Sequence, residues 1–519
     1  MHRLAIALTA LVVLAAGTYL GLYYLLLSGV TDRAASLVPA DAIAYANVYL
    51  QPSTSQQMRL GALIGRLPGF EDTSTMDAKI DEITQNLLSS AGVDYRADIR
   101  PWLGNQASIA LLPGTEEGAQ PIPVAFLATT QEAEARAALA RATADQGADL
   151  EMIDHAGTEV TVAGDTAWAF VDDLLVISQS ATGVEASIDV RGGEPSLASS
   201  ASFRDTMADL PADHLASVFL DLSRATQLAG SSTELSGWTV AGAALLAEDR
   251  GLRLAGTAPF QSEEVTTSPV PATVLATEPS SLVEWMPADT QAEAVIFGAR
   301  QLIEDAESAA AGTEEGQALT DALATARTVA AFALGLDLDA DILPLLDREV
   351  AIAISEVSGG VPAGQLLLNP SNPEAAAEVI ARLTSGLEGL GATTQTQSAG
   401  EGAEITTVEM ADLGSAAYAI HQGVVIVGLS ADDVVAAIEA HESGNTLANS
   451  EAYTATFELA GERAGNELYL DVGAVLDATQ AAAELPTDAR DILNQLGTIG
   501  FTAPSRDDRI DFRVVLTVE

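Results

Sequence analysis

The chain repeats itself, and this duplication constrains its fold more than any other feature of the sequence. The segment AWAFVDDLLVISQS, starting at Ala167, aligns with AYAIHQGVVIVGLS, starting at Ala417, at an offset of 250 residues. The register continues without a gap to Asp221 and Asp471, and 13 of the 55 aligned pairs are identical. Because self-similarity at a fixed offset marks repeated structural units, we expect the two halves of the chain to fold alike.

Matches upstream of this register extend both copies. DYRADIRPWLGNQASIALL from Asp94 aligns with DLDADILPLLDREVAIAIS from Asp337, and SLVPAD from Ser36 aligns with SLVEWMPAD from Ser281. Loops of different length explain the change in offset. The chain therefore divides into an N-terminal anchor, a first copy, a Pro/Ser/Thr-rich linker and a second copy, which span residues 1–31, 32–260, 261–281 and 282–519.

Each copy mixes strand and helix signals in the same order. Apolar stretches such as AIAYANVYL and EAVIFGA predict strands, and AWAFVDDLLVIS predicts a hairpin that turns at Asp172 and Asp173. Asn372 and Pro373 predict the start of a helix. Strands grouped in hairpins and interrupted by helices predict an α+β fold, with two tandem copies of a mixed, largely antiparallel sheet plus helices after one transmembrane helix.

The N-terminal segment predicts a membrane anchor. Residues 4–30 read LAIALTALVVLAAGTYLGLYYLLLSGV, without one charge, and at ~1.5 Å per residue such a helix more than crosses a ~30 Å hydrocarbon core. The alternative is a cleaved signal peptide, whose apolar region is usually shorter. We expect an uncleaved, single-pass anchor in the cell membrane with the large domain outside. Gly17 and Gly21 are weak helix-packing candidates, with incidental spacing as the alternative.

The composition is strongly acidic. The chain has 73 Asp and Glu against 23 Lys and Arg, a net charge of −50, 48% hydrophobic residues and no cysteine. Such a surface repels phosphate backbones, which argues against a nucleic-acid partner. The lack of cysteine excludes disulfides, thiolate nucleophiles and iron–sulfur clusters. Because the acids are spread through both copies, we expect a protein adapted to high salt, where screening weakens self-repulsion.

No standard catalytic motif occurs in the sequence: the G-x-S-x-G, H-E-x-x-H and Walker patterns are missing, and the five histidines are isolated from one another. Asp337, Asp339 and Asp341 resemble the start of a calcium-binding loop. However, Ile342 and Arg348 occupy the positions that need glycine and glutamate, so we expect turn or capping roles. The sequence thus predicts no catalytic residue, no cofactor and no metal ligand.

Two acids are matched across the copies. Asp221 and Asp471 each stand where a strand leads into a helical segment, and we expect a structural role for both, most simply as helix caps. The aromatic residues Trp168 and Tyr418 also match each other. With Trp102, they are interpreted as core or boundary aromatics.

Three segments of the first copy carry a family resemblance: SLVPADAIAYANVYL, DYRADIRPWLGNQASIALL and SLASSASFRDTMADLP. Together with the N-terminal helix, they resemble a family of membrane-anchored bacterial extracytoplasmic proteins known only as a domain of unknown function. The stretch from Asp98 to Gly104 is the most specific part, and the second copy departs from it with Leu-Leu-Asp at 345–347. The resemblance implies an envelope location and carries over no activity and no functional residue.

These features predict a protein that is not an enzyme. We expect a membrane-anchored extracytoplasmic protein with a binding or envelope-assembly role, whose partners are the membrane, through its N-terminal helix, and an envelope protein or lipid. The alternative is a carrier or chaperone for lipid or another apolar ligand, which a continuous apolar cavity would favour. A third hypothesis is an envelope hydrolase with a dispersed site. The oligomeric state is left open.

Overall fold

The computed structural model divides the chain into two compact units, which are described separately. Unit 1 comprises Met1–Glu234 and Trp238–Pro259, and unit 2 comprises Leu235–Gly237 and Phe260–Glu519. The structure describes residues 32–68, 70, 85, 94–115, 119–144, 149–228, 238–260, 276–310, 316–358, 361–399, 402–411, 414–478, 493–506 and 508–519.

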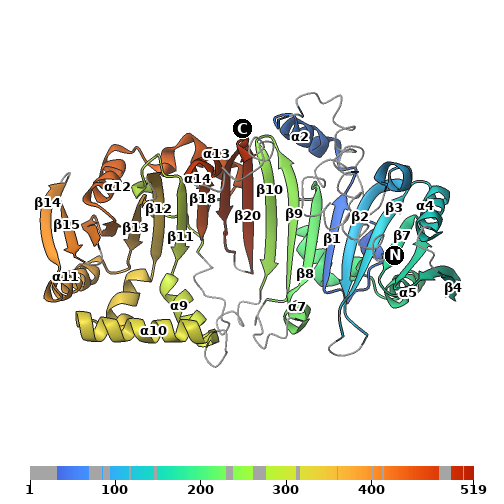
Figure 1. The fold of residues 1–519 in the computed structure, drawn as a ribbon, viewed down its shortest axis with the longest axis horizontal. Coiled ribbons are helices and arrows are strands. Elements are labelled where there is room, and N and C mark those ends of the chain that lie inside the picture. Colours follow the sequence, from blue (N-terminus) through green and yellow to red (C-terminus); the bar gives the residue numbers. More distant parts are fainter. Residues whose placement is uncertain are drawn as a thin grey trace. The chain divides into compact units, whose positions relative to one another are not determined.

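The strands of unit 1 form one antiparallel sheet. Its spatial order is β4-β5-β6-β7-β3-β2-β1-β8-β9-β10 (Figure 1). The strands are β1 (Ala44–Tyr49), β2 (Leu103–Leu112), β3 (Ile122–Thr129), β4 (Leu150–His155), β5 (Thr158–Ala163), β6 (Thr166–Val171), β7 (Leu174–Ser178), β8 (Ala216–Asp221), β9 (Val240–Glu248) and β10 (Gly251–Pro259). The helices are α2 (Thr54–Ile64), α4 (Glu132–Ala144), α5 (Ala181–Gly192), α6 (Ala201–Ala208) and α7 (Leu222–Leu228), with short turns η1 (Ala34–Ser36), η3 (Tyr95–Ile99) and η4 (Leu197–Ser199).

Unit 2 has the same strand order. Its antiparallel sheet runs β14-β15-β16-β17-β13-β12-β11-β18-β19-β20. The strands are β11 (Ala292–Phe297), β12 (Glu349–Ser358), β13 (Val361–Asn369), β14 (Thr393–Ala399), β15 (Ala403–Met410), β16 (Gly414–His421), β17 (Val424–Gly428), β18 (Glu467–Asp471), β19 (Leu496–Thr502) and β20 (Arg509–Val518). The helices are α9 (Ala299–Ala310), α10 (Gln317–Val329), α11 (Pro373–Gly389), α12 (Ala431–Ser443), α13 (Glu451–Ala460) and α14 (Val472–Ala478), with turns η6 (Leu282–Trp285), η7 (Ala330–Leu334), η8 (Leu338–Ile342), η9 (Leu343–Leu346) and η10 (Leu447–Asn449).

The predicted α+β class with a largely antiparallel sheet is confirmed. Strand by strand, β1 to β10 correspond in pairing order to β11 to β20, so each predicted hairpin has a counterpart in the other unit. The predicted turn at Asp172 is present, with a positive φ angle of 54°, and Gln422 adopts a φ angle of 48° at the equivalent hairpin of unit 2.

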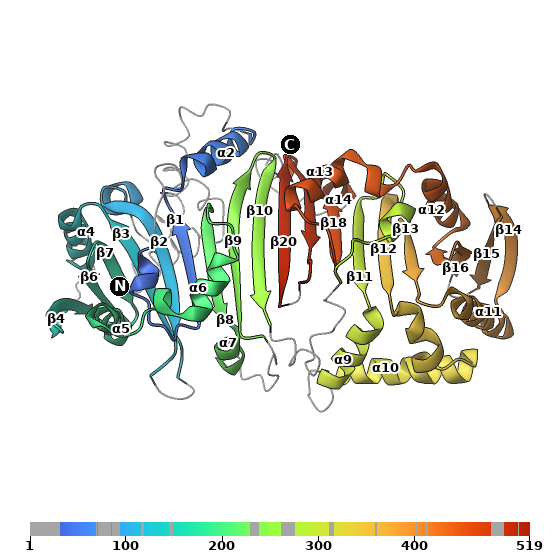
Figure 2. The same ribbon diagram turned by 180° about the vertical axis from the view of Figure 1, so that it is seen from behind.

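Both faces of the unit 2 sheet carry packed side chains. Along β17, Val424 and Ile426 belong to the core under α12 and α13, whereas Val425 belongs to a second core under α11. This alternation follows from the two-residue period of a strand. Figures 1 and 2 show α11 and α12 at the end of the sheet that carries β14 and β15.

Within the described ranges, no helix is long and apolar enough to cross a membrane. The predicted anchor, residues 1–31, lies outside the described residues, and so do its helix-packing candidates Gly17 and Gly21.

Candidate functional site: an apolar pocket in unit 2

Helix α11 forms one wall of an apolar pocket. The helix starts where the sequence predicts, because the Asn372 side chain accepts a hydrogen bond from the Ala375 amide at 3.1 Å and Pro373 occupies the first helical position. Its Val379 and Ile380 are buried against the sheet. The next turns of the same helix leave Leu383, Thr384 and Leu387 facing the pocket, along with Ile380.

Strands β15, β16 and β17 form the opposite wall. Val408 and Met410 come from β15, Ala416 and Tyr418 from β16, and Val427 from β17. The pocket has a volume of about 250 Å³. This is slightly less than the ~300–1,000 Å³ of pockets that enclose a drug-sized ligand, so the space suits one narrow apolar group better than a bulky ring system.

One hydrogen bond joins the two walls. The Tyr418 hydroxyl lies 2.9 Å from the Thr384 hydroxyl, which also donates to the Ile380 carbonyl at 2.9 Å. The polar ends of both side chains are thereby satisfied within the protein. The tyrosine ring therefore presents mainly apolar surface to the pocket.

The equivalent position in unit 1 holds a larger side chain. Trp168 pairs with Thr161 in the same way that Tyr418 pairs with Thr406. Trp168 is 7% exposed, in agreement with its interpretation as a core or boundary aromatic. An indole at position 418 would consequently take up space that the pocket leaves open.

Unit 2 also buries three glutamates on adjacent strands. Glu293, Glu349 and Glu467 are 2–3% exposed. The strand registers place all three on one sheet face, because Glu467 pairs with Val295 and Glu349 pairs with Phe297.

Two of these carboxylates accept hydrogen bonds from neighbouring groups. Glu467 accepts from Arg463 at 2.7 Å and from the Tyr453 hydroxyl. Glu349 accepts from Ser280, Ser281 and Asn369.

Glu293 differs from the other two glutamates. Among the described residues, no side chain donates a hydrogen bond to either of its oxygens. Burial and the neighbouring Glu467 carboxylate raise the pKa of Glu293 well above its ordinary value of 4.5, against the lowering effect of Arg463. Burial likewise raises the pKa of Glu467. The side chain of Glu293 is therefore held in its neutral form over a wider pH range than an exposed glutamate.

Neutral polar groups take the corresponding places in unit 1. Tyr45 and Gln106 occupy the strand positions of unit 1 that correspond to Glu293 and Glu349 of unit 2. The Asp32 carboxylate accepts hydrogen bonds from Tyr45 at 2.7 Å and from Gln106 at 2.6 Å. Burial raises the pKa of Asp32, while these hydrogen bonds oppose the shift. Both clusters lie beside the apolar cores of their units, and neither borders the pocket described above.

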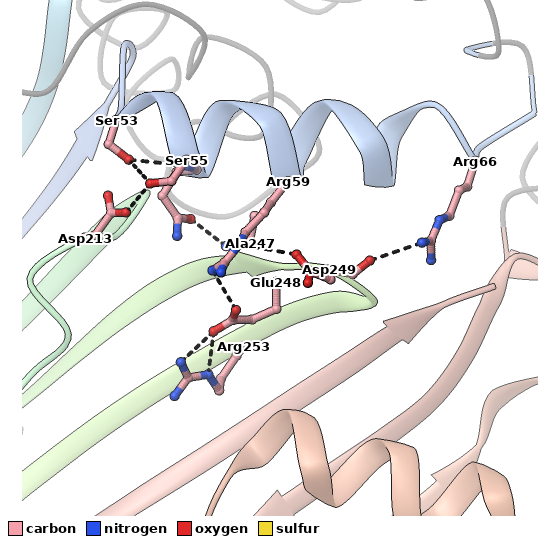
Figure 3. Close-up of polar contacts among 10 residues, drawn as sticks. Ser53, Ser55, Arg59, Arg66, Asp213, Ala247, Glu248, Asp249 and Arg253 are labelled. Atoms are coloured by element: carbon pink, nitrogen blue, oxygen red, sulfur yellow. Dashed lines mark hydrogen bonds and ion pairs between the residues drawn. The ribbon is translucent and has the colours of Figure 1, made fainter.

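Helix α2 is attached to the β9–β10 hairpin by polar contacts (Figure 3). The Ser53 hydroxyl caps its first turn, and the buried Gln56 side chain accepts from the Ala247 amide at 2.8 Å. Arg59 and Arg253 both bind the Glu248 carboxylate, at 2.8 and 2.5 Å. These contacts are structural, because they give partners to Ala247 and Glu248 of β9, which lie beyond the part of this strand that pairs with β8.

The matched acids accept hydrogen bonds at the starts of α7 and α14. Asp221 accepts from the Arg224 amide at 2.9 Å and pairs with the Arg224 guanidinium at 2.6 Å. Asp471 accepts from the Ala474 amide at 2.9 Å. Each carboxylate therefore satisfies a free amide in the first turn of α7 or α14.

The three aspartates of the calcium-like segment also have structural partners. Asp337 accepts from two amides at 2.9 Å, Asp339 pairs with Arg327 at 2.9 Å, and Asp341 pairs with Arg382 at 2.5 Å. The guanidinium partners lower the pKa of Asp339 and Asp341. Within the described ranges, no group of three or more His, Asp or Glu side chains is placed to hold a metal ion.

Comparisons with known proteins give a family and no activity. A family model described as "Protein of unknown function (DUF3352)" matches residues 4–517. No curated protein matches the chain. Among solved structures, crystal form III of TP0453 is 9% identical, with a TM-score of 0.25, and the match covers 43% of this chain and 78% of that one. Crystal form I of TP0453 gives 9% identity, a TM-score of 0.24, and coverage of 45% and 80%.

Proposed function

We propose that this chain, which belongs to the DUF3352 family of proteins of unknown function, binds an apolar ligand at the outer side of the cell membrane. In this role the protein binds its ligand and does not catalyse a reaction. In this proposal, residues 1–31 anchor the protein, and residues 32–260 and 282–519 are duplicated extracytoplasmic domains joined by a linker. The pocket between α11 and β15 to β17 is the observation that carries the proposal.

The proposed ligand is a single aliphatic chain. The lining is aliphatic apart from Thr384, Ser415 and Tyr418, and two of these three hydroxyls bond each other. At ~30 Å³ per water-sized group, the pocket holds about eight such groups. At ~0.8 kcal/mol per buried methylene, a chain of this length gains at most about 6 kcal/mol, so its Kd is no tighter than some tens of micromolar.

Weak binding suits a protein that meets its ligand beside a membrane. An anchored domain experiences a high local lipid concentration, which raises occupancy without a tighter site. A chain that enters and leaves quickly is also what a carrier needs. The carrier role is therefore favoured over a role confined to envelope assembly.

Photocrosslinking of the full chain in polymer-bounded membrane discs tests the proposal. The probe is a dodecyl maltoside with a diazirine at the end of its chain, and the readout is the labelled peptide. We expect labelling of α11, β15 and β16 that falls about tenfold in Tyr418→Trp and in Ala416→Leu, since both substitutions fill the pocket. Tyr418→Phe keeps the shape and should label like the wild type, and equal labelling in all four proteins would refute the site.

A further inference from the structure

We propose that the pocket of unit 2 discriminates by head group, and accepts an aliphatic chain with a neutral or cationic head in preference to an anionic one. The inference rests on the proposed function and concerns the charge at one end of the pocket. It follows from the position of Glu388 relative to strands β14 and β15.

Glu388 follows the pocket residue Leu387 in the last turn of α11 and is not itself part of the lining. Its carboxylate accepts a hydrogen bond from the Thr394 hydroxyl at 2.6 Å. Thr394 pairs directly with Val408, a residue of the pocket lining. Because directly paired residues of an antiparallel ladder point to the same face, Thr394 lies on the pocket side of the sheet and holds the carboxylate there.

The helix end adds to the negative potential. Helix α11 ends at Gly389, one residue after Glu388, and the pocket residue Leu387 belongs to the same last turn. The C-terminus of a helix carries a partial negative charge. A cationic or neutral head group placed here is therefore favoured over an anionic one.

The cation of α11 does not offset this potential. Arg382 is the one basic residue of the helix, against Glu374, Glu378 and Glu388. Its guanidinium pairs with Asp341 at 2.5 Å, so its charge is already compensated. An anionic head group would meet a carboxylate and a helix C-terminus without a free cation on this helix.

The test uses three photoreactive probes that share one dodecyl chain and differ in the head group: trimethylammonium, maltoside or sulfate. Each is crosslinked to the full chain in membrane discs at low salt and equal free concentration. We expect the trimethylammonium and maltoside probes to label the pocket peptides about tenfold more than the sulfate probe. Glu388→Gln should raise labelling by the sulfate probe several-fold and leave labelling by the maltoside probe unchanged.

The control separates a local effect from the net charge of the whole protein. Glu374→Gln removes the same charge at the opposite end of α11, 14 residues away and so about 21 Å along the helix. The inference would be overturned if Glu374→Gln and Glu388→Gln changed labelling by the sulfate probe equally, or if the sulfate and trimethylammonium probes labelled the wild type equally. Either result would leave the pocket itself intact. Absence of pocket labelling with every probe would instead overturn the proposed function.

Discussion

Replacing Glu293 by glutamine should stabilise the protein, and the gain should grow with pH. Glu293 is 3% exposed and stands beside the buried Glu467 carboxylate. Burial raises its pKa well above 4.5, so the folded state holds a proton that the unfolded chain releases. The contribution of this group to stability is complete below about pH 4.5 and is lost as the pH rises towards the raised pKa.

The magnitude follows from proton linkage. While the folded state binds one proton more than the unfolded state, the free energy of unfolding of the wild type falls by about 1.4 kcal/mol per pH unit. Glutamine has the same shape and does not titrate. The difference in unfolding free energy between Glu293→Gln and the wild type should therefore widen by about 1.4 kcal/mol per pH unit above about pH 4.5, and level off beyond the raised pKa.

Urea unfolding of the full chain, followed by circular dichroism from about pH 5 to about pH 8 at constant salt, measures this difference. Glu409→Gln serves as the matched control, because Glu409 is an exposed strand residue of the same unit. Parallel pH profiles for Glu293→Gln and the wild type would mean that the Glu293 carboxylate ionises alike in the folded and unfolded states, which would exclude a raised pKa in the fold.

Three further predictions concern the rest of the fold. The free energy of unfolding should rise from low to molar NaCl, because a Debye length of ~3 Å at 1 M screens the repulsion among charges that sum to −50. A salt series of thermal melts measures this effect, and easier unfolding in molar NaCl would contradict it. Gln56→Ala should lower the free energy of unfolding by about 1–3 kcal/mol, since it leaves the Ala247 amide without its partner. The control Met58→Ala removes a side chain that is 72% exposed, and should leave the free energy of unfolding in urea nearly unchanged. Asp471→Ala should cost about 1 kcal/mol through the lost helix cap, and an unchanged unfolding midpoint would exclude the capping role.

Local structure was predictable wherever one residue type decides it. The cap at Asn372, the caps at Asp221 and Asp471, and the turn at Asp172 each depend on a side chain or a backbone angle within a few residues. Alternation of apolar residues likewise indicated the hairpins. These signals are local, so no knowledge of distant contacts was needed.

The candidate site depends on distant contacts that the sequence pattern does not encode. The sequence identifies Tyr418 as a match to Trp168 and as a core or boundary aromatic, but the pocket depends on how α11 packs beside β15 to β17, where Thr384 meets Tyr418. The buried glutamates have a usable signal, because Glu293 lies on the same strand face as the apolar residues Val295 and Phe297. Their convergence still required the register of three strands that lie far apart in the sequence.

Occupation of the pocket between α11 and the sheet by an aliphatic chain can be measured inside the cell. Cells that express the full chain are grown on a photoreactive fatty acid, and the lipid-bearing peptides are mapped by mass spectrometry after irradiation. We expect lipid adducts on residues 380–387 and 408–418 in the wild type and their loss in Tyr418→Trp, with labelling of residues 1–31 in both. Adducts confined to residues 1–31 in the wild type would contradict occupation of the pocket.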